Sequence, residues 1–150
     1  PRRHARQEMN FYLWVALGSA IGGCVRYALG RELLPHHGAS FPWSTVLINI
    51  IGSFIIGFFG TLTVAGSRWA VPESARIFVM IGLCGGFTTF SSFSLQTYDL
   101  LRSGSWGKAL LNVGLSVVLC LAAVAVGHWI AQQSSHAIAI AQIEEEEYTG

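Results

Sequence analysis

Four long apolar segments, joined by short polar connections, constrain this chain more than any other feature. They cover residues 11–34, 43–66, 75–101 and 106–132. A helix needs roughly 20 mostly apolar residues to cross the hydrocarbon core of a bilayer, and each segment is long enough. Helices are the expected form because a helix pairs its own backbone polar groups, which lipid cannot do. The sequence therefore predicts an all-α membrane protein with four transmembrane helices.

Charge and cysteine content narrow the class further. Charged residues make up 11% of the chain, whereas soluble domains carry about 25%. The net charge is +1 and the only basic run lies at the N-terminus, so we expect no nucleic-acid partner. The three cysteines lie in apolar segments without a C-x-x-C pair, which argues against a disulfide framework or a zinc site.

The four segments define one membrane domain, at residues 11–132, between two tails. Met9 directly precedes the first apolar segment and is a candidate native start, so residues 1–10 are interpreted as an N-terminal tail. The C-terminal tail, residues 133–150, contains four consecutive glutamates at Glu144–Glu147. We expect that tail to be disordered and solvated.

Two of the spans carry polar side chains at intervals of four residues, which places them on one helical face. The stripes are Thr45, Asn49 and Ser53 in the second span, and Asn112, Ser116 and Cys120 in the fourth. An amide inside a membrane needs hydrogen-bond partners. Asn49 could bond a neighbouring helix, or it could offer its two N–H groups to an anion. The polar residues of the fourth span could likewise join helices or line a pore.

The third span is predicted to be a broken helix. Gly85 and Gly86 loosen it, and threonines and serines follow through residue 94. A break inside the membrane is tolerated where the freed backbone groups face protein, water or an ion, and such breaks commonly form ion sites. Phe90 and Phe93, three residues apart, share a face after the break. Ordinary aromatic packing is the alternative interpretation of this pair.

Arg26 lies inside the first span, one helical turn from Gly22 and from Gly30. A charged residue within a span is costly and is usually functional or paired. It could also act structurally, with its long side chain reaching polar groups at the membrane surface.

The chemistry of these polar faces favours a small anion. No Asp, Glu or Lys lies centrally among them, whereas a proton-coupled cation pump needs a carboxylate at depth. Hydroxyl and amide groups donate hydrogen bonds, and the edges of aromatic rings are electropositive. Fluoride, chloride and nitrate all fit this description, and the residues alone do not distinguish them.

Three motifs resemble those of the Fluc (CrcB) fluoride channels. They are Gly22-Gly23 with Arg26-Tyr27, then Asn49-x-x-Gly52-Ser53-Phe54, then the run from Gly85 to Ser94. Their order and spacing match over roughly residues 11–131. One departure is Gln96, at a position where members of the family often carry Glu.

The resemblance implies a passive, selective fluoride channel of the plasma membrane that confers fluoride resistance, and not an enzyme. It implies an antiparallel, dual-topology homodimer, with which the near-even Lys/Arg count of five against four at the two ends is compatible. A structural sodium ion would be held at the dimer centre by the backbone carbonyls of Gly85 and Thr88. The residues implied to line the fluoride pore are Asn49, Phe90, Phe93, Ser116 and Thr89, and Arg26 would be structural or vestibular.

Two other functions are alternatives to a fluoride channel. A small multidrug-type exporter would need a Glu deep in the membrane, and the first span has none at depth, since its one Glu, Glu32, lies near its end. A non-transporting membrane assembly subunit would use its polar stripes only to join helices, and it would show no ion flux as pure protein.

Overall fold

The computed structural model describes residues 2–32, 41–64 and 71–149. The helical elements are α1 (Arg2–Glu32), α2 (Trp43–Leu62), α3 (Glu73–Arg76), η1 (Ile77–Leu83), α4 (Cys84–Phe87), α5 (Phe90–Arg102) and α6 (Trp106–Thr149). Four stretches are long and apolar enough to cross a membrane: Met9–Glu32, Trp43–Leu62, Glu73–Arg102 and Trp106–Ser134. The prediction of four helical spans is confirmed.

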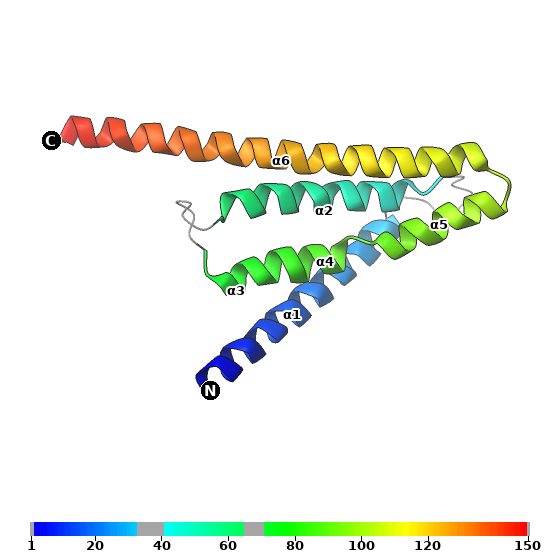
Figure 1. Cartoon of the computed structure of the whole chain (residues 1–150), viewed down its shortest axis with the longest axis horizontal. Coiled ribbons are helices and arrows are strands. Elements are labelled where there is room, and N and C mark those ends of the chain that lie inside the picture. The colour runs from blue at the N-terminus through cyan, green and yellow to red at the C-terminus, as the bar shows by residue number, and fades with distance from the viewer. Residues whose placement is uncertain (1, 33–40, 65–70, 150) are drawn as a thin grey trace.

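Helices α2 and α6 lie side by side and run in the same direction (Figure 1). A Cβ atom added to Gly57 of α2 would lie 2.9 Å from Cα of Val124 in α6, so the two backbones touch. One turn further on, Thr61 Oγ1 lies 2.7 Å from His128 Nδ1. Both pairs are 67 residues apart in the sequence. Along this interface, a residue of α2 therefore lies level with the residue of α6 numbered 67 higher.

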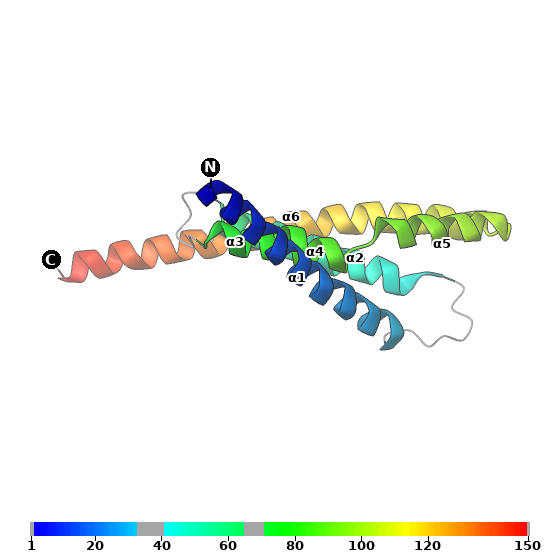
Figure 2. The ribbon, with the colours of Figure 1, turned by 90° about the horizontal axis from the view of Figure 1, so that it is seen from below.

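Helix α1 crosses the third span obliquely (Figure 2). Small residues meet at the crossing, because a Cβ atom on Gly18 would lie 2.9 Å from Cα of Gly82 in η1. The hydroxyl of Ser19 donates to the carbonyl of Gly82 at 3.3 Å. The glycines noted in the first span thus allow the close helix approach that small residues give in membranes.

The third span is built from several consecutive pieces. It starts after Pro72 as α3, widens into the π-helix η1, and returns to α-helix in α4, which ends at Phe87. Thr88 and Thr89 are extended, with ψ of 159° and φ of −152° respectively. Helix α5 then begins at Phe90. The two glycines of α4 and the two β-branched threonines explain a helix end here, since glycine and β-branched residues are weak helix formers.

Both predicted tails are helical in the described backbone. Helix α1 already begins at Arg2, and α6 continues as a helix through Thr149, where disorder was expected. No glycine or proline interrupts residues 128–149, so no residue forces α6 to end at the last apolar residues. The end of α6 consequently projects beyond the other helices (Figure 1).

Candidate functional site

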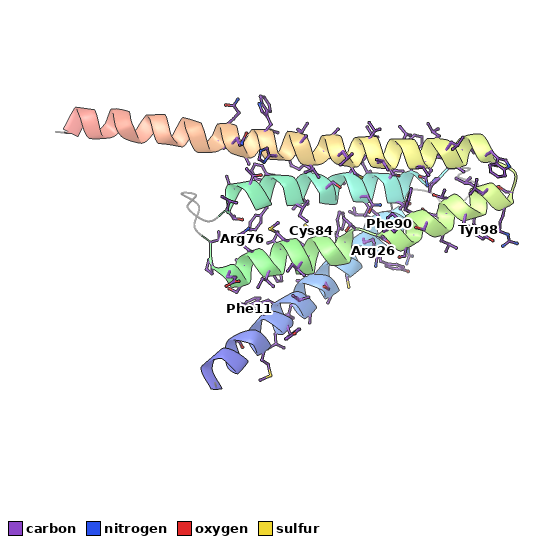
Figure 3. All side chains as sticks on the ribbon, in the orientation of Figure 1. Phe11, Arg26, Arg76, Cys84, Phe90 and Tyr98 are labelled. Carbon is purple, nitrogen blue, oxygen red and sulfur yellow. The ribbon has the colours of Figure 1, made fainter. Side chains whose placement is uncertain are left out.

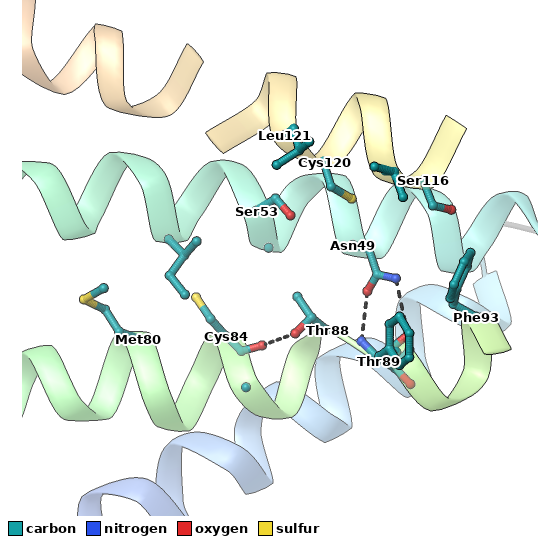
Figure 4. Close-up of a pocket in the computed structure, with 15 residues that line it drawn as sticks. Asn49, Ser53, Met80, Cys84, Thr88, Thr89, Phe93, Ser116, Cys120 and Leu121 are labelled. Carbon is teal, nitrogen blue, oxygen red and sulfur yellow. Dashed lines mark hydrogen bonds between the residues drawn. The ribbon is translucent and has the colours of Figure 1, made fainter. Parts of the chain in front are cut away.

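A cavity of about 500 Å³ lies between α2, α6 and the interruption of the third span (Figure 4). Its walls contain every residue that the sequence assigned to the pore or to the sodium site. These are Asn49, Gly85, Thr88, Thr89, Phe90, Phe93 and Ser116. No charged side chain of the described residues lines it. The fold thus gathers polar side chains from three spans around one uncharged, mostly apolar cavity.

Asn49 of α2 pairs with the peptide backbone of Thr89 (Figure 4). The N–H of Thr89 donates to Asn49 Oδ1 at 2.8 Å, and Asn49 Nδ2 donates to the carbonyl of Thr89 at 3.3 Å. The side-chain amide therefore replaces the backbone partner that Thr89 loses at the helix interruption. Because Nδ2 carries two hydrogens, one N–H remains for a ligand in the cavity that Asn49 lines.

Thr89 also caps α5. Its Oγ1 accepts a hydrogen bond from the N–H of Ser92 at 3.2 Å and donates to the hydroxyl of Ser92 at 2.9 Å. Such a cap satisfies one of the N–H groups that a helix start leaves without partners. On the other side of the interruption, the Thr88 hydroxyl donates to the carbonyl of Cys84 at 2.9 Å. Side chains thus stabilise both ends of the interruption.

Because of these hydrogen bonds, two backbone carbonyls lack the N–H donors that a continuous helix would give them. In a continuous helix, the N–H of Thr89 would donate to the carbonyl of Gly85, and the N–H of Ser92 to that of Thr88. Here the two N–H groups donate instead to Asn49 Oδ1 and to Thr89 Oγ1. The carbonyls that the family resemblance implied for sodium are therefore carbonyls whose helical donors have been redirected.

The two phenylalanines stand together at the start of α5. Their ring centroids are 5.4 Å apart, with an interplanar angle of 44°. Phe90 is 78% exposed in the single chain, whereas Phe93 is half-buried. Figure 3 shows Phe90 where α5 begins, and Tyr98 further along the same helix. Tyr98 does not line the cavity.

Ser116 contributes from α6. Its side chain is buried, and its hydroxyl has no hydrogen-bond partner among the described residues. The offset of 67 between α2 and α6 places Ser116 level with Asn49, and Cys120 level with Ser53. All four side chains line the cavity. The two polar stripes seen in the sequence therefore run side by side.

A second cavity, of about 340 Å³, lies next to the first and is more polar. Arg26 and Arg31 of α1 line it, as do Gln96 of α5 and Thr89. No acidic side chain of the described residues lines it. Thr89 lines both cavities, so the cationic cavity and the neutral one meet at this residue. Arg26 therefore lies in the wall of the cationic cavity, beside the neutral one.

Several lining residues were not identified from the sequence. Met80 and Cys84 line the main cavity four residues apart, with the already assigned Thr88 four residues further on, and this spacing could have placed them on one face. The pairing of Asn49 with the backbone of Thr89 leaves no such signal, because a sequence shows only that the amide needs partners.

Comparison with known proteins supports the resemblance noted in the sequence. A family model described as CrcB-like protein, Camphor Resistance (CrcB), matches residues 13–128. The chain belongs to the CrcB family. Its four spans of membrane-crossing length make it a multi-pass membrane protein.

Relatives from several bacteria are similar over nearly their whole length. A fluoride-specific ion channel FluC of Methylocella silvestris is 59% identical over 120 residues, which is 80% of this chain and 92% of the relative. A protein of the same name from Opitutus terrae is 56% identical over 120 residues, 80% of this chain and 91% of the relative. A third, from Gluconobacter oxydans, is 54% identical over 137 residues, 90% of this chain and 94% of the relative.

Proposed function

We propose that this protein is a passive, fluoride-selective ion channel of the inner membrane that exports fluoride, and that it is a transport protein and not an enzyme. The observation that carries the proposal is the cavity at the interruption of the third span, whose lining is uncharged and mostly apolar but contains several hydrogen-bond donors. Membership of the CrcB family, with relatives named as fluoride-specific channels, supports the same function.

The lining chemistry explains why the ion is a small anion. The second N–H of Asn49 and the unpartnered hydroxyl of Ser116 can each donate a hydrogen bond. The ring edges of Phe90 and Phe93 carry partial positive charge. Fluoride is the smallest halide and accepts hydrogen bonds most strongly, so it gains most from several donors converging at close range. Arg26 and Arg31, in the adjoining cavity, would attract anions to the entrance.

Fluoride export through this protein needs no pump, because the membrane potential supplies the driving force. Hydrogen fluoride crosses membranes as a neutral molecule and ionises inside the cell, so the anion is trapped there. A negative-inside potential drives that anion outwards through a passive pathway, with about 2.3 kcal/mol per charge per 100 mV. The absence of a carboxylate from both linings among the described residues agrees with a channel that does not couple to protons.

We further propose that the third span acts as a broken helix that holds a structural sodium ion. The carbonyls of Gly85 and Thr88, whose helical donors are redirected to Asn49 and to Thr89, would be its ligands. Carbonyl oxygens suit hard cations and can replace part of a hydration shell. Two carbonyls are too few to enclose a cation, so the site requires the same pair from a second copy.

The sodium site and the exposed ring therefore both support a homodimer. Phe90 leaves 78% of its surface uncovered in one chain, although it lines the main cavity. A second copy packed over this face would complete the cavity wall and bring two pairs of carbonyls together. In the proposed antiparallel arrangement, two such pores run along the subunit interface.

The test is ion release from proteoliposomes of the purified protein loaded with potassium fluoride. Valinomycin is added to let potassium leave, and a fluoride electrode follows the anion. We expect fast, valinomycin-dependent fluoride release, and negligible chloride release from matched vesicles loaded with potassium chloride. Absence of fluoride release from folded, reconstituted protein would overturn the proposal and leave the assembly-subunit alternative.

One substitution links the flux to the cavity. Phe90→Ile removes the ring edges at an exposed position, so we expect folding to persist and fluoride release to fall by at least about tenfold, the effect of losing roughly 1.4 kcal/mol at the rate-limiting step. Phe59→Ile is the matched control, because Phe59 of α2 does not line the cavity. Equal loss in both variants would show that the ring of Phe90 has no special role.

A further inference from the structure

Helix α5 carries both candidate pore rings, yet the rest of the subunit holds it loosely. None of its residues is buried, and it packs mainly against α6. At its start, the Asn49–Thr89 pair fixes the backbone next to Phe90. Phe93 lies beyond that anchor. Its position relative to Ser116, on the opposite wall, must therefore be set by other contacts.

A bridge of two hydrogen bonds joins α6 to the carbonyl of Phe93. Asn112 Nδ2 donates to Thr97 Oγ1 at 2.8 Å, and Thr97 Oγ1 donates to the carbonyl of Phe93 at 2.7 Å. Asn112 is only 1% exposed and is the largest fully buried side chain of the described chain. Its oxygen Oδ1 is buried without a hydrogen-bond partner among the described residues, so the bridge depends on the donor side of the amide.

We propose that Asn112 and Thr97 are positioning residues that fix Phe93 in the fluoride pathway. This inference rests on the proposed channel function. Asn112 lies one helical turn from Ser116 on the same face of α6, so a single face carries both the anchor of Phe93 and the hydroxyl opposite it. The bridge thereby sets the separation between a ring edge and a hydroxyl donor, on which discrimination between fluoride and the larger chloride depends.

Helix α5 offers its own matched control. Ser94 Oγ donates to the carbonyl of Phe90 at 2.9 Å, which is the same bond to the preceding turn that Thr97 makes to Phe93. Ser94 is exposed, and no described side chain of another helix donates to it. Removing the Ser94 hydroxyl therefore removes a bond within α5 but no bridge to α6.

The experiment measures initial fluoride and chloride release, per folded protein in proteoliposomes, for four single variants and one double variant. Thr97→Val removes the hydroxyl and keeps the shape, and Asn112→Leu removes the donor amide. We expect each to lower the fluoride-to-chloride rate ratio by about tenfold, since a lost buried hydrogen bond has an effect of that order. The double variant should be no worse than either single variant. Thr97→Ser, which keeps the hydroxyl, and Ser94→Ala should match the parent.

The outcomes separate the possible roles. A purely structural role would lower the yield or the melting temperature in detergent but leave the rate ratio per folded channel at the parent value, which would overturn the proposal. Additive losses in the double variant would also overturn it, because they would show that the two side chains act separately. If Asn112→Leu does not fold, Thr97→Val against Thr97→Ser still decides the question. A parent protein without fluoride flux would refute the channel function, whereas a conducting parent with an unchanged Thr97→Val variant would refute only the bridge.

Discussion

Asn49 serves two purposes with one side-chain amide. Its oxygen and one N–H complete the hydrogen bonds of the Thr89 peptide, and its other N–H is available to the cavity. A buried peptide without partners costs roughly 1–3 kcal/mol per group, so this pairing stabilises the helix interruption. The same contact orients the amide, because a side chain held at both polar atoms cannot rotate. The residue that supports the interruption is thus also a fixed donor to the candidate pore.

Asn49→Asp tests this double role with almost no change in shape. The carboxylate can still accept the N–H of Thr89, but it cannot donate to the Thr89 carbonyl or to an anion, and its charge repels fluoride. We expect fluoride release from proteoliposomes to fall by at least about tenfold, since each 1.36 kcal/mol changes a rate by that factor.

The control for this substitution is Thr63→Val in the turn that ends α2. The hydroxyl of Thr63 donates to the carbonyl of Phe59 in α2 itself, at 2.7 Å, its one hydrogen bond among the described residues, and Thr63 lies outside the cavity. The rate of fluoride release by the Thr63→Val variant should stay near that of the parent protein. Parent-like release from Asn49→Asp would mean that the amide supports the fold alone and takes no part in conduction.

At the scale of single residues, the sequence identifies candidates but not their partners. The spacing of Asn49 and Ser116 on two helical faces was visible, and both line one cavity. The bond from Asn49 to the backbone of Thr89 was not visible, because it depends on how far α2 slides along the third span. The bridge from Asn112 through Thr97 was hidden for the same reason, since it needs the register between α5 and α6.

At the scale of elements, close backbone contact fixes α6 against α2. A Cβ atom on Gly127 would lie 2.8 Å from the backbone nitrogen of Phe58, so an added methyl group has no room. Gly114 lies on the same helix and is exposed, with nothing within 4 Å of the position of a Cβ atom. The two glycines differ only in what faces them. They therefore provide a paired test of whether this packing determines the register of the polar stripes.

We expect Gly127→Ala to destabilise the folded protein by about 1–3 kcal/mol, as overpacking of a tight interface does. Gly114→Ala should be neutral or stabilising by up to about 1 kcal/mol, because alanine favours a helix over glycine. Thermal unfolding of both variants in the same detergent, followed by circular dichroism, measures the difference. Equal melting temperatures would contradict the close contact between α2 and α6.

The four spans were predictable because hydropathy over 20 or more residues is a signal of each segment by itself. Glycines and threonines, which are weak helix formers, surround Thr88 and Thr89, between the end of α4 and the start of α5. The π-helix η1 (Ile77–Leu83) was not expected, since its residues are ordinary apolar ones. It faces α1 at the glycine crossing, so its geometry depends on a neighbour that a local sequence pattern does not reveal. The continuation of α6 to Thr149 was not predicted. The expectation of a disordered tail rested on its run of glutamates, and charge alone does not prevent a helix.

At the scale of the whole molecule, the charges at the two membrane ends are nearly balanced. The end that carries the N-terminus and the second connection has five Lys/Arg residues in the sequence, and the other end has four. Orientation in a membrane follows the excess of positive charge that stays on the cytoplasmic side. A difference of one charge gives little preference, so the chain is expected to insert in both directions. An antiparallel dimer needs both populations in one membrane.

Cysteine labelling in intact cells tests the two orientations directly. Cys24, Cys84 and Cys120 are first replaced by alanine, and either Ser74→Cys or Gly107→Cys is then added. Ser74 lies in the first turn of α3 and Gly107 near the start of α6, so they mark opposite ends of the spans. With a membrane-impermeant maleimide, about half of the protein should label at each position, because nearly equal positive charge at the two ends gives nearly equal insertion in both directions.

The same vesicle assay for fluoride release controls for the function of the cysteine-free background. Complete labelling at one position and none at the other would establish a single orientation. In that case the carbonyls of Gly85 and Thr88 could meet only in a parallel dimer, and the antiparallel arrangement would have to be abandoned. Half-labelling at both positions, in a background that still releases fluoride, is the result that an antiparallel dimer requires, because such a dimer needs both orientations in one membrane. In the proposed antiparallel dimer, four carbonyls would surround one sodium ion, and the two neutral cavities would form separate pores on either side.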